Sequence, residues 1–169
     1  MAPLTTPSDL VILRDVPVGW RTGRLPVRMD PDQHMGDLYP FSLAEKLEKI
    51  TEPSALYKGE GGMIPIEMIS VLLNGSSRAE PMPARGPAVG LFADQEIRLM
   101  KGPLRVSTDY EIEREVVALS GSRRTESAWV MTRVFPPGGA EVLATMLLNT
   151  ATMKASYARY DEELAALAG

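Results

Sequence analysis

Glu67 is the one ionisable residue in an apolar stretch at residues 66–73. Glycines precede this stretch, among them Gly61 and Gly62, and Pro65 stands where a proline fits the first turn of a helix. Glycines before a helix leave backbone N–H groups open to a carbonyl or an anion. A buried carboxylate is costly unless it is paired or catalytic. The pattern therefore predicts either proton transfer by Glu67 beside N–H donors or an ion pair inside the core.

A second group of reactive side chains lies between residues 34 and 42. His34 is the only histidine, and histidine is the side chain whose ordinary pKa lies nearest neutrality. Asp37 precedes a turn that contains proline, so it is either a turn residue or an acid–base group. Tyr39 is either a packing residue or a hydroxyl donor to a carbonyl. Ser42 fits the N-cap of a helix over residues 42–50, with a glutamate three positions on.

Composition excludes several classes of function. The chain has 169 residues, a net charge of -4, no cysteine and one histidine. Disulfides, cysteine nucleophiles and multi-histidine metal sites are therefore excluded, and no metal is expected. No large basic cluster, nucleotide-binding glycine motif or membrane-length apolar run occurs, so neither nucleic acid nor membrane is an expected partner. The polar, proline-containing start predicts a cytoplasmic protein, with a flexible tail at residues 1–9 and one domain at 10–169.

The apolar pattern predicts the elements that position these groups. Residues 9–13 form a short apolar run typical of an edge strand, and residues 16–27 are typical of an irregular ribbon. The helix over residues 66–73 is apolar nearly all round and is expected to be buried. From residue 88 the period changes to two, which predicts strands at 89–100, 104–119, 125–135 and 140–155, followed by a helix at 157–168.

The fourth of these strands is apolar on both faces between residues 142 and 148. Such a strand is expected to be covered on both sides. A single sheet cannot both enclose the apolar helix and cover this second face. A symmetric partner is therefore expected, in a homodimer or a larger assembly.

The order of these elements over residues 10–157 resembles the hotdog superfamily, in which a long antiparallel sheet wraps around a central helix. The second half carries most of the resemblance, at residues 94–99, 101–104 and 123–126. It looks like the sheet of MaoC-like hydratases and of acyl-carrier-protein dehydratases. The resemblance implies an α+β chain with a single hotdog domain.

MaoC-like proteins carry an Asp-x-Asn-Pro-x-His loop ahead of the central helix. The corresponding residues here run from Asp37 through Tyr39 and Pro40 to Ser42, with aspartate and proline matching. Tyr39 replaces the asparagine, and Ser42 replaces the catalytic histidine. The family's oxyanion glycine, in its Gly-Met pair, corresponds to Gly62 and Met63.

A second alignment follows the acyl-carrier-protein dehydratases, in which an acid lies five residues after the glycine at the helix start. Gly62 and Glu67 keep this spacing without the proline that usually precedes the glycine. Some hotdog thioesterases also use a helix carboxylate near this position. This alignment assigns the acid–base role to Glu67, and the histidine of those thioesterases, where present, is placed differently from His34.

The resemblance implies hydration or dehydration of an acyl thioester on coenzyme A or an acyl carrier protein. No cofactor is expected beyond that carrier. Together with the residues' own chemistry, it gives Asp37, Glu67, His34 and Tyr39 as the candidate catalytic residues, and Gly61, Gly62 and Met63 as the candidate oxyanion and substrate contacts. Two alternatives remain: thioester hydrolysis with Glu67 as base or nucleophile, and a non-catalytic acyl-binding partner subunit, which the replacement at Ser42 would suit.

Overall fold

The computed structural model describes residues 7, 9–34, 41–49, 54–59, 61–75 and 79–168, so most of the expected tail at 1–9 lies outside the described residues. The elements are β1 (Leu25–Val27), α1 (Leu43–Glu48), the 3-10 helix η1 (Ala55–Tyr57), α2 (Ile66–Asn74), β2 (Gly90–Leu99), β3 (Tyr110–Gly121), β4 (Thr125–Phe135), β5 (Ala144–Met153), the 3-10 helix η3 (Lys154–Ser156) and α3 (Tyr160–Ala168).

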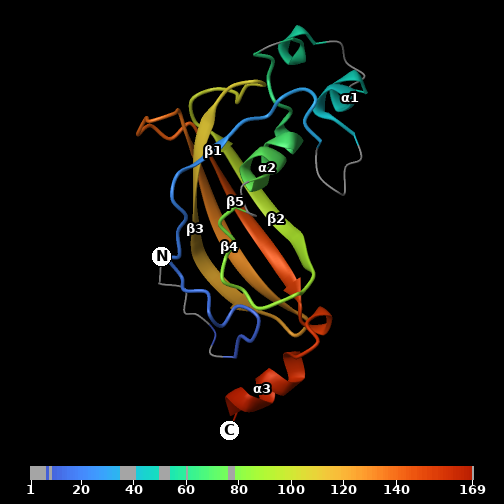
Figure 1. The fold of residues 1–169 in the computed structure, drawn as a ribbon, viewed down its shortest axis with the longest axis vertical. Helices are drawn as coiled ribbons and strands as arrows, with labels where there is room; N and C mark the ends of the chain where they lie inside the picture. Colours follow the sequence, from blue (N-terminus) through green and yellow to red (C-terminus); the bar gives the residue numbers. More distant parts are fainter. Residues whose placement is uncertain are drawn as a thin grey trace.

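The five strands form one antiparallel sheet in the order β1-β3-β4-β5-β2. β3, β4 and β5 are neighbours in sequence and in space because short turns join them, as sequential strands usually are. β2 pairs with the far side of β5 and forms one edge of the sheet. Figure 1 shows the sheet as a long curved layer with α2 against one face. The predicted antiparallel sheet around a helix is confirmed.

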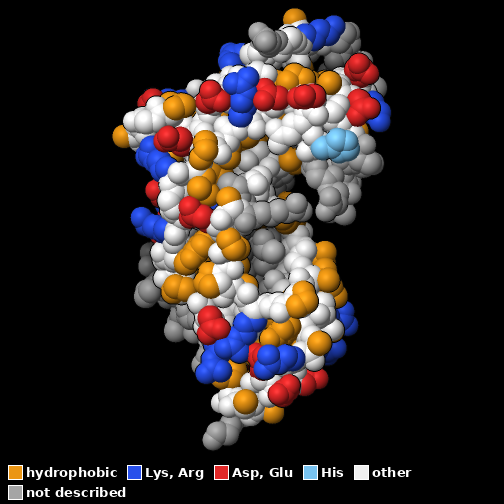
Figure 2. Space-filling model, in the orientation of Figure 1, with side chains coloured by type: hydrophobic (Ala, Val, Ile, Leu, Met, Phe, Trp, Pro, Cys, Tyr) orange, Lys and Arg blue, Asp and Glu red, His pale blue; other side chains and the backbone are white. Residues whose placement is uncertain are grey.

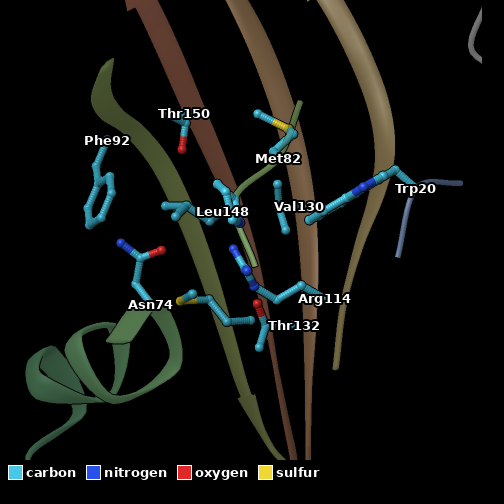
Figure 3. A pocket seen from close by; sticks show the side chains of 11 residues that line it. Trp20, Asn74, Met82, Phe92, Arg114, Val130, Thr132, Leu148 and Thr150 are labelled. Atoms are coloured by element: carbon cyan, nitrogen blue, oxygen red, sulfur yellow. The ribbon is translucent and has the colours of Figure 1, made fainter. Parts of the chain in front are cut away.

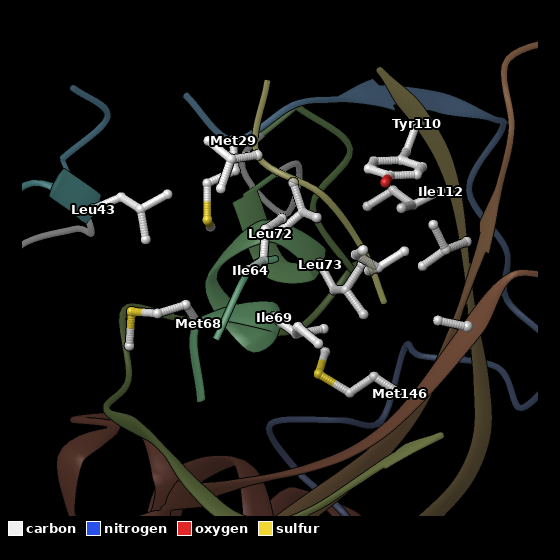
Figure 4. Close-up of a cluster of buried hydrophobic side chains, with 14 of the residues drawn as sticks. Met29, Leu43, Ile64, Met68, Ile69, Leu72, Leu73, Tyr110, Ile112 and Met146 are labelled. Carbon is white, nitrogen blue, oxygen red and sulfur yellow. The ribbon is translucent and has the colours of Figure 1, made fainter. Parts of the chain in front are cut away.

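α2 packs on the sheet through one side only. Met68, Ile69, Leu72 and Leu73 are buried against side chains of β3, β4 and β5, among them Met146 (Figure 4). Burying each such side chain stabilises the fold by about 1.5–3 kcal/mol. Ile66, in the first turn, is 59% exposed. The prediction of a helix buried all round is therefore wrong at its N-terminal end.

The opposite half of the same sheet face is covered by the N-terminal segment. Residues 10–13 are buried as expected from their apolar character, but they form turns and not the predicted strand. The N–H groups of Val11 and Leu13 donate to the carboxylate of Glu126 in β4, at 2.8 and 2.9 Å. These bonds replace the ladder that a strand would need.

A polar network fastens two further segments over this end of the sheet. Arg85, in the long connection between α2 and β2, donates to Asp15 at 2.8 Å and to Glu163 of α3 at 2.5 Å. The Tyr157 hydroxyl also donates to Glu163, at 2.8 Å. The hydrogen bond from Arg85 lowers the pKa of the Glu163 carboxyl, so this carboxyl stays ionised at neutral pH. The connection is thereby held against the segment around Asp15 and against α3.

The predicted strand over residues 104–119 begins only at Tyr110. Before it the chain bends at Ser107, whose φ of 57° lies in the left-handed region. The backbone of this bend forms hydrogen bonds with the segment before α2. The Leu104 carbonyl accepts from Ile64 N–H at 2.9 Å, and Val106 N–H donates to the Gly62 carbonyl at 2.8 Å. Local contacts with the start of α2 therefore replace sheet pairing in these six residues.

The outer face of the sheet is only partly covered. Ala144, Met146 and Leu148 of β5 are buried on the α2 side, while Leu147 on the other side is half-buried. The expected cover on both sides of β5 is thus absent among the described residues of a single chain. Edge strand β2 is exposed over nearly its whole length.

Candidate functional site

Gly61 and Gly62 lie where the backbone before α2 runs close to the segment around Arg105. The Gly61 carbonyl accepts from Arg105 Nη1 at 2.7 Å, and Met63 pairs with Arg105 in an antiparallel bridge. The expected oxyanion donor, Gly62 N–H, donates to the Gly59 carbonyl at 3.2 Å. An oxyanion role for this N–H therefore requires exchange of an internal hydrogen bond.

Gly62 is also required by packing. A Cβ at this position would lie 3.0 Å from the backbone carbon and oxygen of Tyr57. We expect Gly62→Ala to lower the free energy of unfolding by about 1–3 kcal/mol, because backbone must move to admit the methyl group.

Gly75 is the matched control, since it has a helical φ of -58° and, among the described residues, no atom lies within 4 Å of the point that an added methyl group would occupy. Gly75→Ala should leave stability unchanged or raise it by about 0.4–1 kcal/mol. Urea unfolding of both variants checks the pair. Equal stability of the two variants would contradict this role of Gly62.

Glu67 lies in the first turn of α2 and points to solvent. Its side chain is 52% exposed, and Lys46 Nζ of α1 lies 3.6 Å from its Oε1. The expectation of a buried carboxylate is wrong, because the N-terminal turn projects beyond the core that α2 covers. The carboxylate is favoured there by the positive end of the helix dipole. Among the described residues the backbone N–H groups of Ile66 and Glu67 have no acceptor, as expected for a first turn.

His34 is exposed, and its backbone pairs with that of Ser42 in one antiparallel bridge. Ser42 caps α1: its Oγ accepts from Glu45 N–H at 3.2 Å, and its own N–H donates to the Glu45 carboxylate at 2.7 Å. The predicted capping box is confirmed. These bonds to Ser42 lower the pKa of the Glu45 carboxyl. Asp37 and Tyr39 lie outside the described residues.

Two kinds of feature are absent from the described part of the chain. Within it, no group of three or more His, Cys, Asp or Glu side chains is arranged to hold a metal ion. None of the helices that the structure describes is both long and apolar enough to cross a membrane.

A cavity of about 240 Å³ lies on the α2 side of the sheet, beyond the C-terminal end of the helix (Figure 3). Four polar or charged residues line it, which are Asn74, Arg114, Thr132 and Thr150. The rest of the lining is apolar and comes from several separate segments, as Trp20, Pro81, Met82, Phe92, Val130, Met146 and Leu148. A concave, largely apolar site with a few polar groups is typical of small-molecule binding.

The cavity exists because α2 is short relative to the sheet. Its nine residues span about 13 Å, whereas the 12 residues of β3 span about 40 Å. The hydrophobic cluster under α2 and the cluster under residues 10–16 are therefore separate. The cavity lies between them, with Met146 and Leu148 from the first and Trp20, Met82 and Val130 from the side chains packed on the second.

The distribution of side-chain types on the surface agrees with a cavity that lies between the two hydrophobic clusters. In Figure 2 charged side chains gather mainly toward the two ends of the molecule, and hydrophobic and uncharged side chains occupy much of the face between them. Phe92 of β2, which lines the cavity, is 57% exposed. The apolar lining therefore reaches the surface at the β2 edge of the sheet.

Arg114 is the cavity residue that the sequence interpretation missed. Its position on β3 lies between buried Ile112 and Val116 on the face that α2 covers, and it is only 7% exposed. A charge at an inward position of an alternating strand was the available signal. Its Nη2 donates to the Glu80 carbonyl at 2.5 Å, and the guanidinium lies 5.8 Å from the Trp20 ring centre. Burial lowers the pKa of this guanidinium.

Those sequence-predicted residues that the structure describes are not gathered around this cavity. Glu67 and the Gly61–Met63 segment lie at the N-terminal end of α2, and Asn74, at the other end, lines the cavity. His34 lies beside α1. The structure thus separates a polar region at the start of α2 from an apolar cavity at its end.

No protein-family model and no curated protein matches this sequence. Solved structures do match. A MaoC-like dehydratase from Rhodospirillum rubrum superposes with a TM-score of 0.57 at 13% identity, covering 85% of this chain and 97% of that one. An (R)-hydratase from A. caviae gives 0.52 at 20% identity, with 81% and 97% covered. The (3R)-hydroxyacyl-ACP dehydratase complex HadBC from Mycobacterium tuberculosis gives 0.53 at 10% identity, with 80% and 96% covered.

These matches, together with the sheet order and the enclosed helix, define the class: the chain has the hotdog fold. Within that fold it is similar to MaoC-like dehydratases and hydratases, as its sequence pattern predicted. At these identities the likeness concerns the fold.

Proposed function

We propose that this chain binds an acyl thioester and adds or removes water next to the thioester carbonyl. The observation that carries the proposal is the cavity of about 240 Å³ between α2 and the N-terminal segment, because its largely apolar lining suits an acyl chain. The substrate is carried on coenzyme A or on the phosphopantetheine of a carrier protein. The reaction needs no other cofactor.

The chemistry needs a base, an acid and a donor to the thioester oxygen. Asp37 is the proposed base, since it keeps its place in the loop motif. His34 and Tyr39, at and within the same loop, are the proposed acids. The donors are backbone N–H groups at the start of α2, where those of Ile66 and Glu67 have no acceptor in the described structure while that of Gly62 is engaged.

Glu67 is the second proposed acid–base group. It stands 52% exposed at the same helix end, so it can exchange protons with water. Lys46 Nζ lies 3.6 Å from its carboxylate.

The test is incubation with a panel of enoyl and saturated acyl-CoA thioesters. We expect water addition to an enoyl thioester, followed as loss of its ultraviolet absorbance. Release of free thiol from saturated substrates would instead identify a hotdog thioesterase. Binding without either reaction would contradict both catalytic functions.

The second candidate is a non-catalytic acyl-binding subunit. Ser42, which stands where the family's histidine would be, is occupied by both bonds of the α1 capping box. A position used to start a helix contributes no acid or base to a substrate. This candidate predicts tight acyl-thioester binding with no turnover in the panel.

We also propose that two copies associate through β2. This edge strand exposes Leu91 and Leu99, followed by exposed Met100, and an open edge strand is prone to pairing with another chain. Light scattering at micromolar concentration should give at least twice the 18.4 kDa of one chain. Leu91→Lys, on the face opposite the cavity, should shift the equilibrium toward monomer, whereas a monomeric wild type would contradict the proposal.

A further inference from the structure

We propose that the substrate carries a long acyl chain of about 12 to 18 carbons, which reaches from the start of α2 into the cavity; this inference rests on the proposed function. The proposed carbonyl donors and the cavity lie at opposite ends of α2. The nine residues of this helix span about 13 Å. A substrate that occupies both places must bridge this length.

The length of α2 and the volume of the cavity together set the length of the acyl chain. An extended chain advances ~1.2 Å per single bond, a third of the ~3.3–3.6 Å that an extended peptide spans per residue. Bridging about 13 Å therefore takes about 11 carbon atoms. At ~30 Å³ per water-sized group, the cavity of about 240 Å³ holds about eight more. A hexanoyl chain ends only about half-way along the helix.

A row of side chains on β2 offers the route. Residues paired across an antiparallel sheet share a face, so this row points to the face that α2 covers. Leu99 is 40% exposed and Phe92 is 57% exposed, while Ile97 between them is half-buried and packs on the cluster under α2. The β2 row consists of Leu99, Ile97, Gln95 and Phe92, opposite Ala144, Met146, Leu148 and Thr150 of β5. It is apolar except for Gln95, and the described residues cover it incompletely.

The β2 row runs beside α2 from one end of the helix to the other. Leu99 lies toward the start of α2, because the segment after β2 bonds to the residues just before the helix: the Leu104 carbonyl accepts from Ile64 N–H at 2.9 Å. Phe92 lies at the other end, where it lines the cavity together with Asn74 of α2 (Figure 3). An acyl chain on this row therefore starts near the proposed carbonyl donors and ends in the cavity.

The cavity suits the methyl end of such a chain. Most of its lining is apolar, and its charged member, Arg114, donates to the Glu80 carbonyl and lies over the Trp20 ring. The guanidinium therefore has partners within the chain and needs none from the substrate. Each methylene group that becomes fully buried strengthens binding about fourfold. Affinity should thus rise steeply once the chain is long enough to enter the cavity.

The experiment is calorimetric titration of the full chain with hexanoyl-CoA and tetradecanoyl-CoA, at concentrations where both are monomeric. We expect wild type to bind tetradecanoyl-CoA at least about tenfold more tightly. Thr150→Trp fills part of the cavity, so it should lose most of this preference and bind hexanoyl-CoA as wild type does. Thr152→Trp is the matched control, on the same face of the same strand but outside the lining, and should keep the preference.

Trp20 supplies a second readout that leaves the cavity unchanged. Trp20 lines the cavity, whereas Trp129, the other tryptophan of the chain, does not. In a Trp129→Phe variant, tetradecanoyl-CoA should therefore shift the fluorescence emission of Trp20, and hexanoyl-CoA should not.

Equal wild-type affinities for the two thioesters would overturn the inference while the proposed function stands. So would a Trp20 emission that hexanoyl-CoA shifts as much as tetradecanoyl-CoA does. A full preference retained in Thr150→Trp would place the long chain outside the cavity and would also overturn the inference. Failure of both thioesters to bind would overturn it together with the proposed function.

Discussion

Glu126→Gln is expected to lower the free energy of unfolding by about 3 kcal/mol, although it changes no volume. The Glu126 side chain is fully buried. Its Oε1 accepts from Val11 N–H at 2.8 Å and from the Tyr160 hydroxyl at 3.0 Å, and its Oε2 accepts from Leu13 N–H at 2.9 Å. A glutamine offers one acceptor oxygen, and its NH₂ would face a backbone donor.

Urea unfolding of the two forms measures this effect. Tyr160→Phe is the graded control, because it removes one of the three hydrogen bonds and leaves the carboxylate in place. That variant should lose about 1 kcal/mol. Glu126→Gln with wild-type stability would show that the carboxylate does not hold the N-terminal segment.

Asp37→Asn is expected to reduce turnover of the thioester substrate by about 100-fold or more, which is about 2.7 kcal/mol of barrier. Asparagine keeps the shape of the side chain but cannot accept a proton as a base. Steady-state kinetics on the best substrate of the acyl-CoA panel give the number. Asp32→Asn, at an exposed position shortly before the same loop, should retain full activity.

The Glu67→Gln variant distinguishes the role of Glu67 from that of Asp37. The Glu67 side chain is 52% exposed and its Lys46 partner is 3.6 Å away, so its removal should change stability by no more than about 1 kcal/mol. A large loss of rate in Glu67→Gln with full activity in Asp37→Asn would transfer the base role to Glu67. Unchanged turnover in both variants would contradict catalysis by either carboxylate.

The local sequence pattern was sufficient to predict the elements whose interactions are with residues close in sequence. The capping box at Ser42, α2 and the strands β3, β4 and β5 follow from periodicity and from turn residues close in sequence. The expected strand at residues 9–13 failed because its backbone donors bond to a carboxylate 115 and 113 residues away. No local pattern carries that information.

The candidate site was harder to predict for a related reason. Apolar residues around α2 indicate burial along its sides, but they do not indicate where its first turn ends relative to the sheet, and there Glu67 emerges into solvent. The alternation of β3 predicts that Arg114 points inward. It does not predict the cavity that Arg114 lines, because residues far apart in sequence, such as Trp20 and Met82, form that cavity. Site residues that depend on long-range packing can be identified only once the fold is known.

The most direct test of the proposed function is a crystal structure of the protein with a bound, unreactive acyl-CoA analogue. We predict acyl-chain density in the cavity beyond the end of α2, in contact with Phe92, Met82 and Leu148. Density for the acyl chain elsewhere on the protein, with this cavity empty, would contradict the proposal.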